Sequence, residues 1–247
     1  MKLSKDIELL DGMPIAFIKS LNAIVISDPH LGYEGVMAKH GVFIPKVNIK
    51  KMLEILSLAI KRTRASKIIV DGDIKNEFST VDPEEFNELG DFINFARQAG
   101  VEPILIKGNH DNFVEQYKEH FKLQIYRQEA LLGKYLFFHG EEMPHKIDYS
   151  ETLIMGHEHP AIGIYGEAGS KEKLKCFLYG EYCGKALLVM PAMNYFAGGT
   201  EINSRPKTAL LSPLLRGHNI EKMHAIALGY GSTIDFGTIA DLRQAYK

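Results

Sequence analysis

Five apolar runs between about residues 20 and 155 have the composition of buried β-strands. Each is rich in Ile, Val, Leu or Phe and shows no alternation with polar residues, which is typical of strands buried on both faces. The runs cover residues 23–26, 68–70, 104–106, 136–138 and 153–155. Helix-length amphipathic segments alternate with them. This alternation predicts an α/β fold built from βαβ units.

Two helices between these runs are predicted with defined positions. Over residues 46–62, apolar residues recur at the spacing of a single helix face. The second helix is expected to begin after Asp82, an N-capping residue type, with Pro83 in the first helical position. Glu85 completes a pattern like a capping box, and Gly100 is suited to end the helix.

From about residue 160 onward the helical period fades. Short β-like pieces cover residues 173–179, 186–190 and 208–211, separated by Gly and Pro turns. They predict a second, mostly antiparallel sheet, and residues 239–246 are expected to form a short helix. Because we find no repeat, low-complexity tract or linker, residues 1–247 are interpreted as a single domain.

Composition and charge restrict the class of protein. The chain has 45% hydrophobic and 24% charged residues and a net charge of −2, so it has no basic footprint of the kind found in proteins that coat DNA. The spacing of Cys176 and Cys183 matches no usual zinc or redox motif, and free buried thiols are expected. No apolar segment has the length of a signal peptide core or a membrane span, which predicts a soluble, cytoplasmic protein.

Clusters of Asp, Asn and His directly follow the five predicted strands. Loops at the carboxyl ends of neighbouring strands converge in space in α/β sheets, so these side chains are expected to meet. Taken singly, each cluster is more simply explained as a polar turn. Their ordered conjunction is what predicts a metal site. The clusters are Asp28-Pro29-His30, Gly72-Asp73, Gly108-Asn109-His110-Asp111, His139-Gly140 and Gly156-His157-Glu158-His159.

The number and type of these residues indicate two metal ions. In an extended chain, residues two apart point to the same side, so Asp28 with His30, and His157 with His159, could each reach one cation. The full ligand set is too large for one tetrahedral zinc with an open position, but it suits two five- or six-coordinate ions that share a carboxylate. The candidate metal ligands are Asp28, His30, Asp73, Asn109, His139, His157 and His159.

These motifs, in this order, resemble the calcineurin-like metallophosphoesterases over roughly residues 22–162. The segments 27–32, 156–160 and 191–200 are similar to a prokaryotic subgroup related to the double-strand-break-repair nuclease and to DNA-ligase-associated phosphoesterases. The resemblance implies an α/β (α+β) fold, a four-layer αββα sandwich with two mixed β-sheets flanked by helices. It also implies a dinuclear site at the sheet edge.

The resemblance further implies a role for each site residue. Asp28, His30 and His159 would bind one metal, and Asn109, His139 and His157 the other. Asp73 would bridge the two ions. His110 would be the catalytic acid, with Asp111 as the residue that orients it. One departure concerns Asn76, because many members have Asp or His three residues after the bridging Asp.

The chemistry expected from this site is hydrolysis of a phosphoester by a hydroxide that bridges the metals. The resemblance to the subgroup favours phosphodiesters, in nucleic acid or a nucleotide, as the substrate. His110 would protonate the leaving group, and no phosphoenzyme is expected. Mn²⁺ is the expected ion, with Fe, Ni²⁺ and Zn²⁺ as alternatives. A phosphomonoesterase with the same site and a noncatalytic scaffold remain alternatives. A metallo-β-lactamase-like or amidohydrolase enzyme is disfavoured by the order of the motifs.

A few other residues are candidates for contact with the substrate, on less evidence from the sequence. The loop Gly198-Gly199-Thr200 could cradle a phosphate through backbone N–H groups, although a turn explains its glycines equally well. His40, Arg205 and Lys207 are candidate substrate contacts for which a structural or surface role is favoured. The sequence indicates no membrane partner. It leaves the oligomeric state open, with a homodimer as one option.

Overall fold

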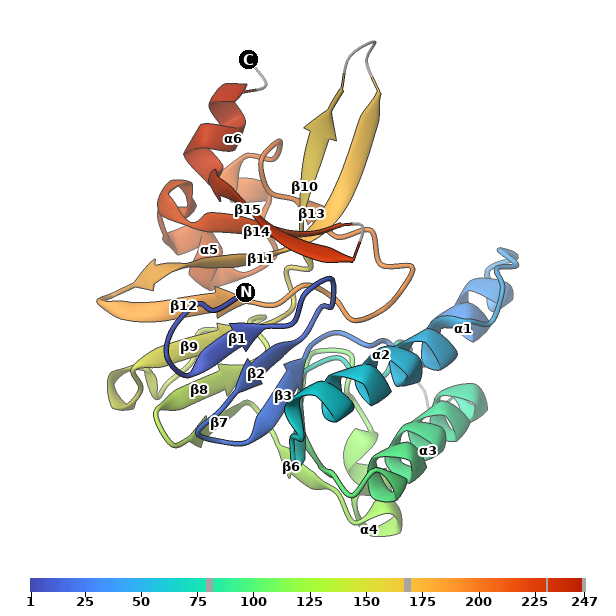
Figure 1. Ribbon diagram of the computed structural model, residues 1–247. Coiled ribbons are helices and arrows are strands. Elements are labelled where there is room, and N and C mark those ends of the chain that lie inside the picture. The colour runs from blue at the N-terminus through green and yellow to red at the C-terminus, as the bar shows by residue number, and fades with distance from the viewer. Residues whose placement is uncertain (79–81, 167–169, 230, 246–247) are drawn as a thin grey trace.

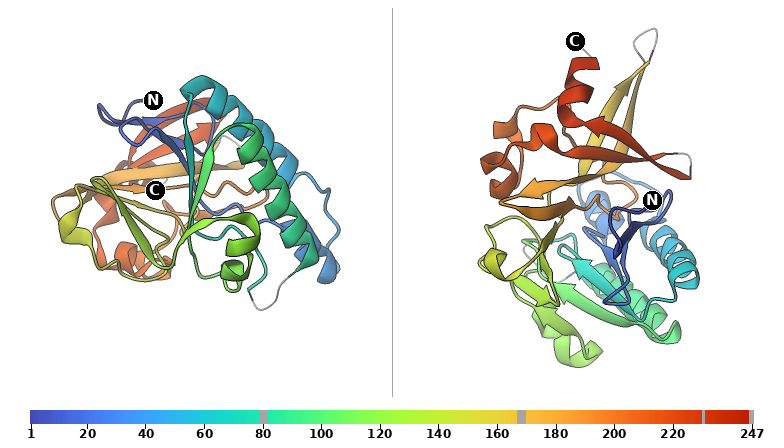
Figure 2. Two further views of the ribbon diagram at one scale, coloured as in Figure 1. Left: turned by 90° about the horizontal axis from the view of Figure 1, so that it is seen from below. Right: turned by 60° about the vertical axis from the view of Figure 1, so that its left-hand side comes forward.

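Two β-sheets pack face to face, and helices cover the outer face of each, which gives four layers (Figure 1). The structure is a computed structural model that describes residues 1–78, 82–166, 170–229 and 231–245. Figure 2 shows the longer helices against one sheet and the carboxy-terminal helices beyond the other. The expected αββα sandwich with two mixed sheets is confirmed.

The first sheet contains the amino-terminal strands in sequence order. β2 is antiparallel to both of its neighbours, β1 and β3, whereas β3 to β6 run parallel to one another. Ile and Val dominate the central strands, since β-branched side chains suit a pleated, buried surface. The strands are β1 (Ile7–Leu9), β2 (Ala16–Ile18), β3 (Ala23–Ile26), β4 (Lys67–Asp71), β5 (Glu102–Ile106) and β6 (Gln124–Tyr126).

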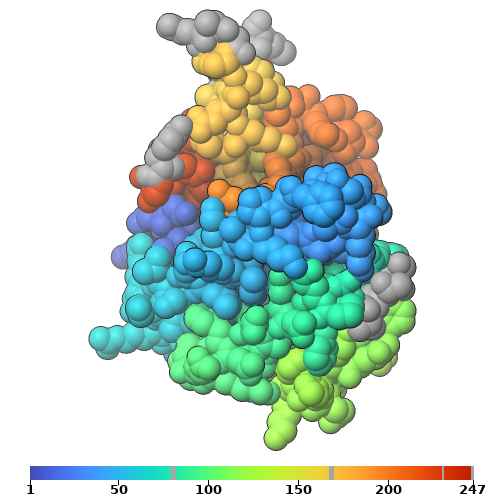
Figure 3. All heavy atoms as spheres, turned by 90° about the vertical axis from the view of Figure 1, so that its right-hand side faces the viewer, coloured from blue at the N-terminus to red at the C-terminus, as the bar shows by residue number. Residues whose placement is uncertain are grey.

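The helices on this sheet show how the sequence sets their ends. α2 (Asn48–Thr63) ends at Arg64 in a left-handed conformation, and α3 (Pro83–Gln98) is capped by the Asp82 side chain, which accepts from the N–H groups of Glu84 and Glu85. Figure 3 shows α1 (Tyr33–Lys39), α2 and α3 lying together on one face. The 3-10 turn η1 (Val114–Tyr117) and α4 (Lys118–Phe121) complete this layer.

The second sheet has the order β13-β10-β11-β12-β9-β8-β7, and β14 pairs with both β11 and β15. The long strand β11 pairs with β10 along its first part and with β12 and β14 along its second. The strands are β7 (Glu129–Leu132), β8 (Tyr135–Phe138), β9 (Thr152–Met155), β10 (Pro160–Tyr165), β11 (Lys171–Tyr182), β12 (Lys185–Val189), β13 (Thr200–Glu201), β14 (His224–Gly229) and β15 (Ser232–Thr238).

Short helices cover the outer face of the second sheet. They are α5 (Pro213–Gly217), α6 (Ile239–Ala245) and the 3-10 turns η2 (Ile147–Tyr149), η4 (Lys207–Ala209) and η5 (Ile220–Lys222). The helix expected at residues 239–246 is therefore confirmed as far as Ala245. Tyr246 lies outside the described residues.

The alternation of side chains across each strand builds the core. In β3, Ala23 and Val25 face the second sheet, whereas Ile24 and Ile26 face the helices. Burying one such branched side chain stabilises the fold by roughly 1.5–3 kcal/mol. Three apolar clusters result, one between the sheets and one under each helical layer. They hold the strand ends, where the polar clusters lie, in fixed positions.

All five predicted strands of the first part are confirmed, but their distribution is not the expected one. Residues 136–138 and 153–155 lie in β8 and β9, which belong to the second sheet because β9 pairs in parallel with β12. The second sheet is therefore mixed, and most of its strand pairs are antiparallel as expected. The strand predicted at 208–211 is wrong, since Lys207–Ala209 forms a 3-10 turn that buries Leu210.

Two smaller expectations also need correction. The Glu85 carboxylate does not form the capping-box contact of α3, because it accepts hydrogen bonds from the N–H groups of Asn76 and Glu77. Of the two free cysteines, Cys176 is buried as predicted, but Cys183 is exposed. Among the residues that the structure describes, no helix is both long and apolar enough to cross a membrane.

Candidate metal centre

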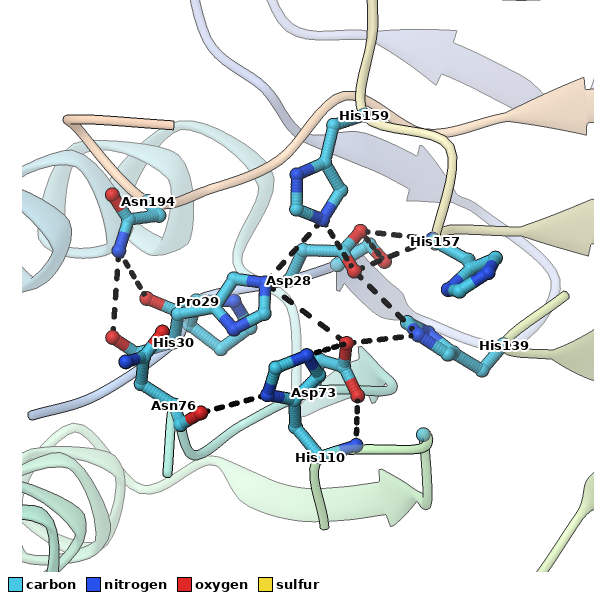
Figure 4. Close-up of polar contacts among 12 residues, drawn as sticks. Asp28, Pro29, His30, Asp73, Asn76, His110, His139, His157, His159 and Asn194 are labelled. Atoms are coloured by element: carbon cyan, nitrogen blue, oxygen red, sulfur yellow. Dashed lines mark hydrogen bonds and ion pairs between the residues drawn. The ribbon is translucent and has the colours of Figure 1, made fainter. Parts of the chain in front are cut away.

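Residues from both sheets meet at one edge of the sandwich (Figure 4). The loops after β3, β4 and β5 carry Asp28, His30, Asp73 and Asn109, and the loops after β8 and β9 carry His139, His157 and His159. The expected convergence of the carboxyl ends of these strands is confirmed. Six of these side chains, which lie up to 131 positions apart in sequence, thus border one site, and Asn109 follows the neighbouring strand β5.

Two groups of ligating atoms can be distinguished. In the first, made of Asp28, His30 and His159, the ligand atoms lie within 4.8 Å of one another. His159 Nε2 is 2.9 Å from Asp28 Oδ1 and 3.3 Å from His30 Nε2. The second group consists of Asp73, His139 and His157 and meets the same criterion.

Asp73 lies between the two groups. Its Oδ2 atom is 3.1 Å from His139 Nε2 in its own group and 4.0 Å from His30 Nε2 in the other. His139 Nε2 is in turn 3.8 Å from Asp28 Oδ1. The two groups are therefore adjacent, and each carboxylate lies within 4.0 Å of an imidazole of the other group.

The backbone of the ligand loops is left-handed rather than extended. Asp28, His30, Asp73, His157 and His159 have φ between 45° and 65°. The expectation that Asp-x-His pairs converge through an extended chain is therefore wrong, although the pairs do converge. Asp tolerates this region better than most residues, as does His, and such strain of about 1–3 kcal/mol per residue persists only where the surroundings enforce it. Here the N–H groups of Asp28 and His30 donate to the Gly72 and Asp73 carbonyl oxygens, at 3.1 and 3.0 Å.

Neighbouring polar groups fix the orientation of the ligands. The Ser27 hydroxyl lies 2.6 Å from Asp28 Oδ2, which also accepts from the His157 N–H at 3.2 Å. The Nδ1 atom of His139 lies 3.2 Å from the Asp71 carbonyl oxygen, so its Nε2 atom faces the centre. Such supporting contacts are typical of metal-binding imidazoles.

Except at His139, the electrostatics of the centre favour the protonation states that metal ligands need. Burial raises the pKa of Asp28, but His159 and the other imidazoles more than offset this, so the net shift is downward. Burial lowers the pKa values of His30 and His157 to about 4. Burial alone would also lower the pKa of His139, but the Asp73 and Asp28 carboxylates raise it well above 6.5. Without a cation, His139 thus supplies the positive charge between two carboxylates.

The donor set fits two divalent cations. The buried side-chain oxygen of Asn109 has no hydrogen-bond partner among the described residues, which leaves a hard oxygen donor available. Together with two carboxylates and four imidazoles it makes the mixed O/N set that suits Mn²⁺, Fe, Ni²⁺ or Zn²⁺.

His110 borders this centre, but Asp111 does not contact its ring. His110 Nε2 lies 4.0 Å from Asp73 Oδ2, and His110 Nδ1 lies 2.7 Å from the main-chain carbonyl oxygen of Asn76. The Asp111 carboxylate instead accepts from the N–H groups of Gly108 and Lys75, at 2.9 and 3.2 Å. Asp111, whose pKa is raised to about 7 by burial and by Asp73, therefore holds the loop and not the imidazole.

Asn194 supports the centre in a way that the sequence did not indicate. Its buried side-chain amide donates to the carbonyl oxygens of Pro29 and His30, at 3.3 and 3.4 Å. Its position shortly after β12 is the signal that could have identified it, because the other site residues also follow strands of the sandwich.

The remaining candidate substrate contacts do not form part of the cluster of potential ligands. Gly199 has a φ of 68° and lies against the backbone of His159, while the N–H of Thr200 donates to the His159 carbonyl oxygen at 2.8 Å. This loop is a turn that supports the ligand loop. His40, Arg205 and Lys207 are exposed.

The family model described as calcineurin-like phosphoesterase matches residues 21–183. No curated protein sequence matches. The solved structure of Pseudomonas putida nuclease MPE is similar with a TM-score of 0.63 at 19% identity, covering 92% of this chain and 94% of that one. The phosphoesterase YfcE from E. coli gives a TM-score of 0.42 at 17% identity, covering 87% and 98%. These structural likenesses concern the fold alone.

Proposed function

This chain belongs to the calcineurin-like phosphoesterase family, and we propose that it hydrolyses phosphodiesters at a dinuclear metal centre with His110 as the proton donor. The observation that carries the proposal is the arrangement around Asp73. Its carboxylate lies between two groups of potential ligands and also borders the His110 ring.

Each residue of the centre has a proposed role. Asp28, His30 and His159 would hold one ion, Asn109, His139 and His157 would hold the other, and Asp73 would be shared by both. Two divalent cations held in this way would supply an acidified water molecule and positive charge for the phosphoryl oxygens. Mn²⁺ is the proposed ion, with Fe, Ni²⁺ or Zn²⁺ as alternatives.

His110 would deliver a proton to the departing oxygen. A carbonyl oxygen can only accept a hydrogen bond, so the Nδ1 atom that faces Asn76 carries a hydrogen, and Nε2 is the atom turned toward the centre. General acids of this type contribute about 10²- to 10⁴-fold to the rate. Because water supplies the attacking oxygen, no covalent phosphoenzyme forms.

An aromatic ring beside His110 supports a diester with a large leaving group. The Phe78 side chain is 50% exposed, and its ring contacts the His110 ring edge-on at 5.6 Å. A nucleoside that leaves from the His110 side would find an apolar surface for its base there. The fold is also that of a protein named as a nuclease. These features support nucleic acid or a nucleotide as the substrate.

A substrate panel tests this proposal. The purified protein is assayed with Mn²⁺, Fe²⁺, Ni²⁺ and Zn²⁺ against single-stranded DNA, cyclic nucleotides, nucleoside monophosphates and a nitrophenyl diester. We expect metal-dependent turnover of diesters, with little release of phosphate from monophosphates. A preference for monophosphates would identify a phosphomonoesterase, and no turnover with any metal would identify a noncatalytic scaffold. A cytoplasmic location and a homodimer stay predictions.

A further inference from the structure

A buried glutamate on helix α3 reaches the loop that contacts His110. Glu85 is 2% exposed, and its Oε1 atom accepts hydrogen bonds from the N–H of Asn76, at 2.9 Å, and from the N–H of Glu77. The carbonyl oxygen of Asn76 is the group that lies 2.7 Å from His110 Nδ1. Glu85 and His110 are thus connected through the same short piece of backbone.

The geometry of one peptide unit links the two contacts. The Asn76 carbonyl and the Glu77 N–H belong to a single planar trans peptide, in which C=O and N–H point in opposite directions. The N–H is directed to Glu85, so the C=O must be directed away from it, toward His110. Fixing one side of this peptide therefore aims the other.

A buried cation completes the arrangement. Lys75 is 4% exposed, and its Nζ atom lies 3.5 Å from Glu85 Oε2. The same ammonium donates to the main-chain carbonyl oxygen of His110 at 3.3 Å and to that of Glu77. A buried charge pair is costly unless its members are well partnered. Here the partners of the pair include both the backbone of His110 and the loop that faces its ring.

We propose that Glu85, paired with Lys75, is a positioning residue that aims the Asn76 carbonyl at His110 Nδ1 and so directs Nε2 to the leaving group. The inference rests on the proposed role of His110 as proton donor. The main chain of Asn76 makes the contact, so the Asn76 side chain is not needed for it. Glu85, through the Asn76 carbonyl that it holds, thus takes the role of orienting His110 that the family resemblance implied for Asp111.

The first test compares leaving groups. Turnover is measured with saturating Mn²⁺ on an alkyl diester, which needs a proton on departure, and on a nitrophenyl diester, which does not. We expect Glu85→Ala to lower the alkyl-to-nitrophenyl ratio by about 10- to 100-fold, a part of the full effect of a general acid. Glu85→Gln keeps an oxygen acceptor and should restore most of the ratio, and Asn76→Ala should leave it within about twofold.

Glu129 offers a matched control. It is also a buried carboxylate that accepts from two backbone N–H groups, those of His145 and Lys146, and its Oε1 atom lies 3.5 Å from Lys146 Nζ. Glu129→Ala should lower the thermal stability to a similar extent but leave the ratio unchanged. An unchanged ratio in Glu85→Ala, or an equal loss of the ratio in Glu129→Ala or Asn76→Ala, would overturn the proposal.

A second measurement does not depend on turnover. NMR of the wild-type protein labelled with ¹⁵N and ¹³C should show a hydrogen on His110 Nδ1 with a coupling through the hydrogen bond to the Asn76 carbonyl carbon. Glu85→Ala should abolish this coupling. Its absence from the wild type refutes the inference even if Glu85→Ala does not fold. If the coupling is present but no diester is hydrolysed, the proposed function fails while the positioning contact stands.

Discussion

His139 Nε2 lies 3.1 Å from Asp73 Oδ2, although the two residues follow strands of different sheets. Both side chains are buried. The other oxygen of Asp73, Oδ1, accepts a hydrogen bond from the main-chain N–H of His110 at 2.9 Å. Asp73 is therefore the residue at which the two ligand groups and the proposed proton donor come together.

Replacing this carboxylate by an amide should weaken both metal sites. Asp73→Asn preserves shape but removes one negative charge that both ions would share, so elemental analysis should show fewer than one ion per chain after gel filtration. Asp148→Asn, at an exposed position of η2, is the control and should keep the wild-type metal content. Retention of two ions in Asp73→Asn would contradict the bridging role.

Removing the His110 ring should harm poor leaving groups selectively. For His110→Ala we expect a loss of about 10²- to 10⁴-fold on a dinucleotide and a much smaller loss on a nitrophenyl diester. His120→Ala serves as the control, since that ring packs against Phe86 on α3 and Phe121 on α4. Equal losses of kcat for both substrates in His110→Ala would remove His110 from the acid role.

Gly156 allows the Asp28 carboxylate to lie close to the ligand loop of His157. A Cβ atom at this position would overlap Ser27 Oγ and lie 2.7 Å from Asp28 Oδ2. Gly156→Ala should therefore displace Asp28 and lower metal affinity at least tenfold, as measured by titration calorimetry. At Gly217 nothing lies within 4 Å of the added atom, so Gly217→Ala should bind metal normally. Unchanged affinity in Gly156→Ala would show that the loop can yield.

The Glu88 carboxyl should make stability depend on pH. Burial raises its pKa from 4.5 to about 7, despite a hydrogen bond from the Gly32 N–H. The folded state thus binds this proton more tightly than the unfolded state, so the contribution of Glu88 to stability is greatest below pH 4.5 and declines as the pH rises to 7. Glu88→Gln should flatten this decline, with roughly 2–4 °C in Tm for each kcal/mol involved. Glu102→Gln, at an exposed position of β5, should retain the wild-type profile; a Glu88→Gln profile parallel to it would be contrary evidence.

Phe78 should contribute to substrate preference. Phe78→Ala is expected to raise KM for a dinucleotide about 5- to 150-fold, the equivalent of losing about 1–3 kcal/mol of base stacking, and to leave KM for a dimethyl-type diester unchanged. Tyr149→Ala removes another exposed aromatic ring, on η2, and should have no effect on either KM. An equal rise for both diesters would argue against a stacking surface.

The sequence predicted which candidate ligands come together because strand ends and ligand residue types coincide locally. Asp28, Asp73 and His139 each follow an apolar run that could be recognised without knowing its neighbours. The distribution of strands between sheets depends on pairing between distant segments, such as β9 with β12. Periodicity within one segment does not contain that information, which is why β8 and β9 were expected in the first sheet.

The contacts around His110 were beyond the reach of sequence reasoning for a different reason. Glu85 fits a helix-capping pattern, and the family resemblance implied that Asp111 orients His110, but the hydrogen bonds of both carboxylates among the described residues go elsewhere. The actual partners are main-chain groups of residues 75–77, whose direction depends on the path of the loop. A motif specifies side chains, whereas this orientation is set by a backbone carbonyl.

The division of the ligands between two sheets has a mechanical consequence. Each group takes members from both layers, Asp28 and His30 with His159, and Asp73 with His139 and His157. A bound ion would therefore connect the two sheets and stabilise their packing, in addition to the contacts that the polypeptide itself makes. A chelator would then lower the thermal stability of the protein as well as abolish the proposed activity. The concentration of available metal in the cell would accordingly influence the lifetime of the folded protein.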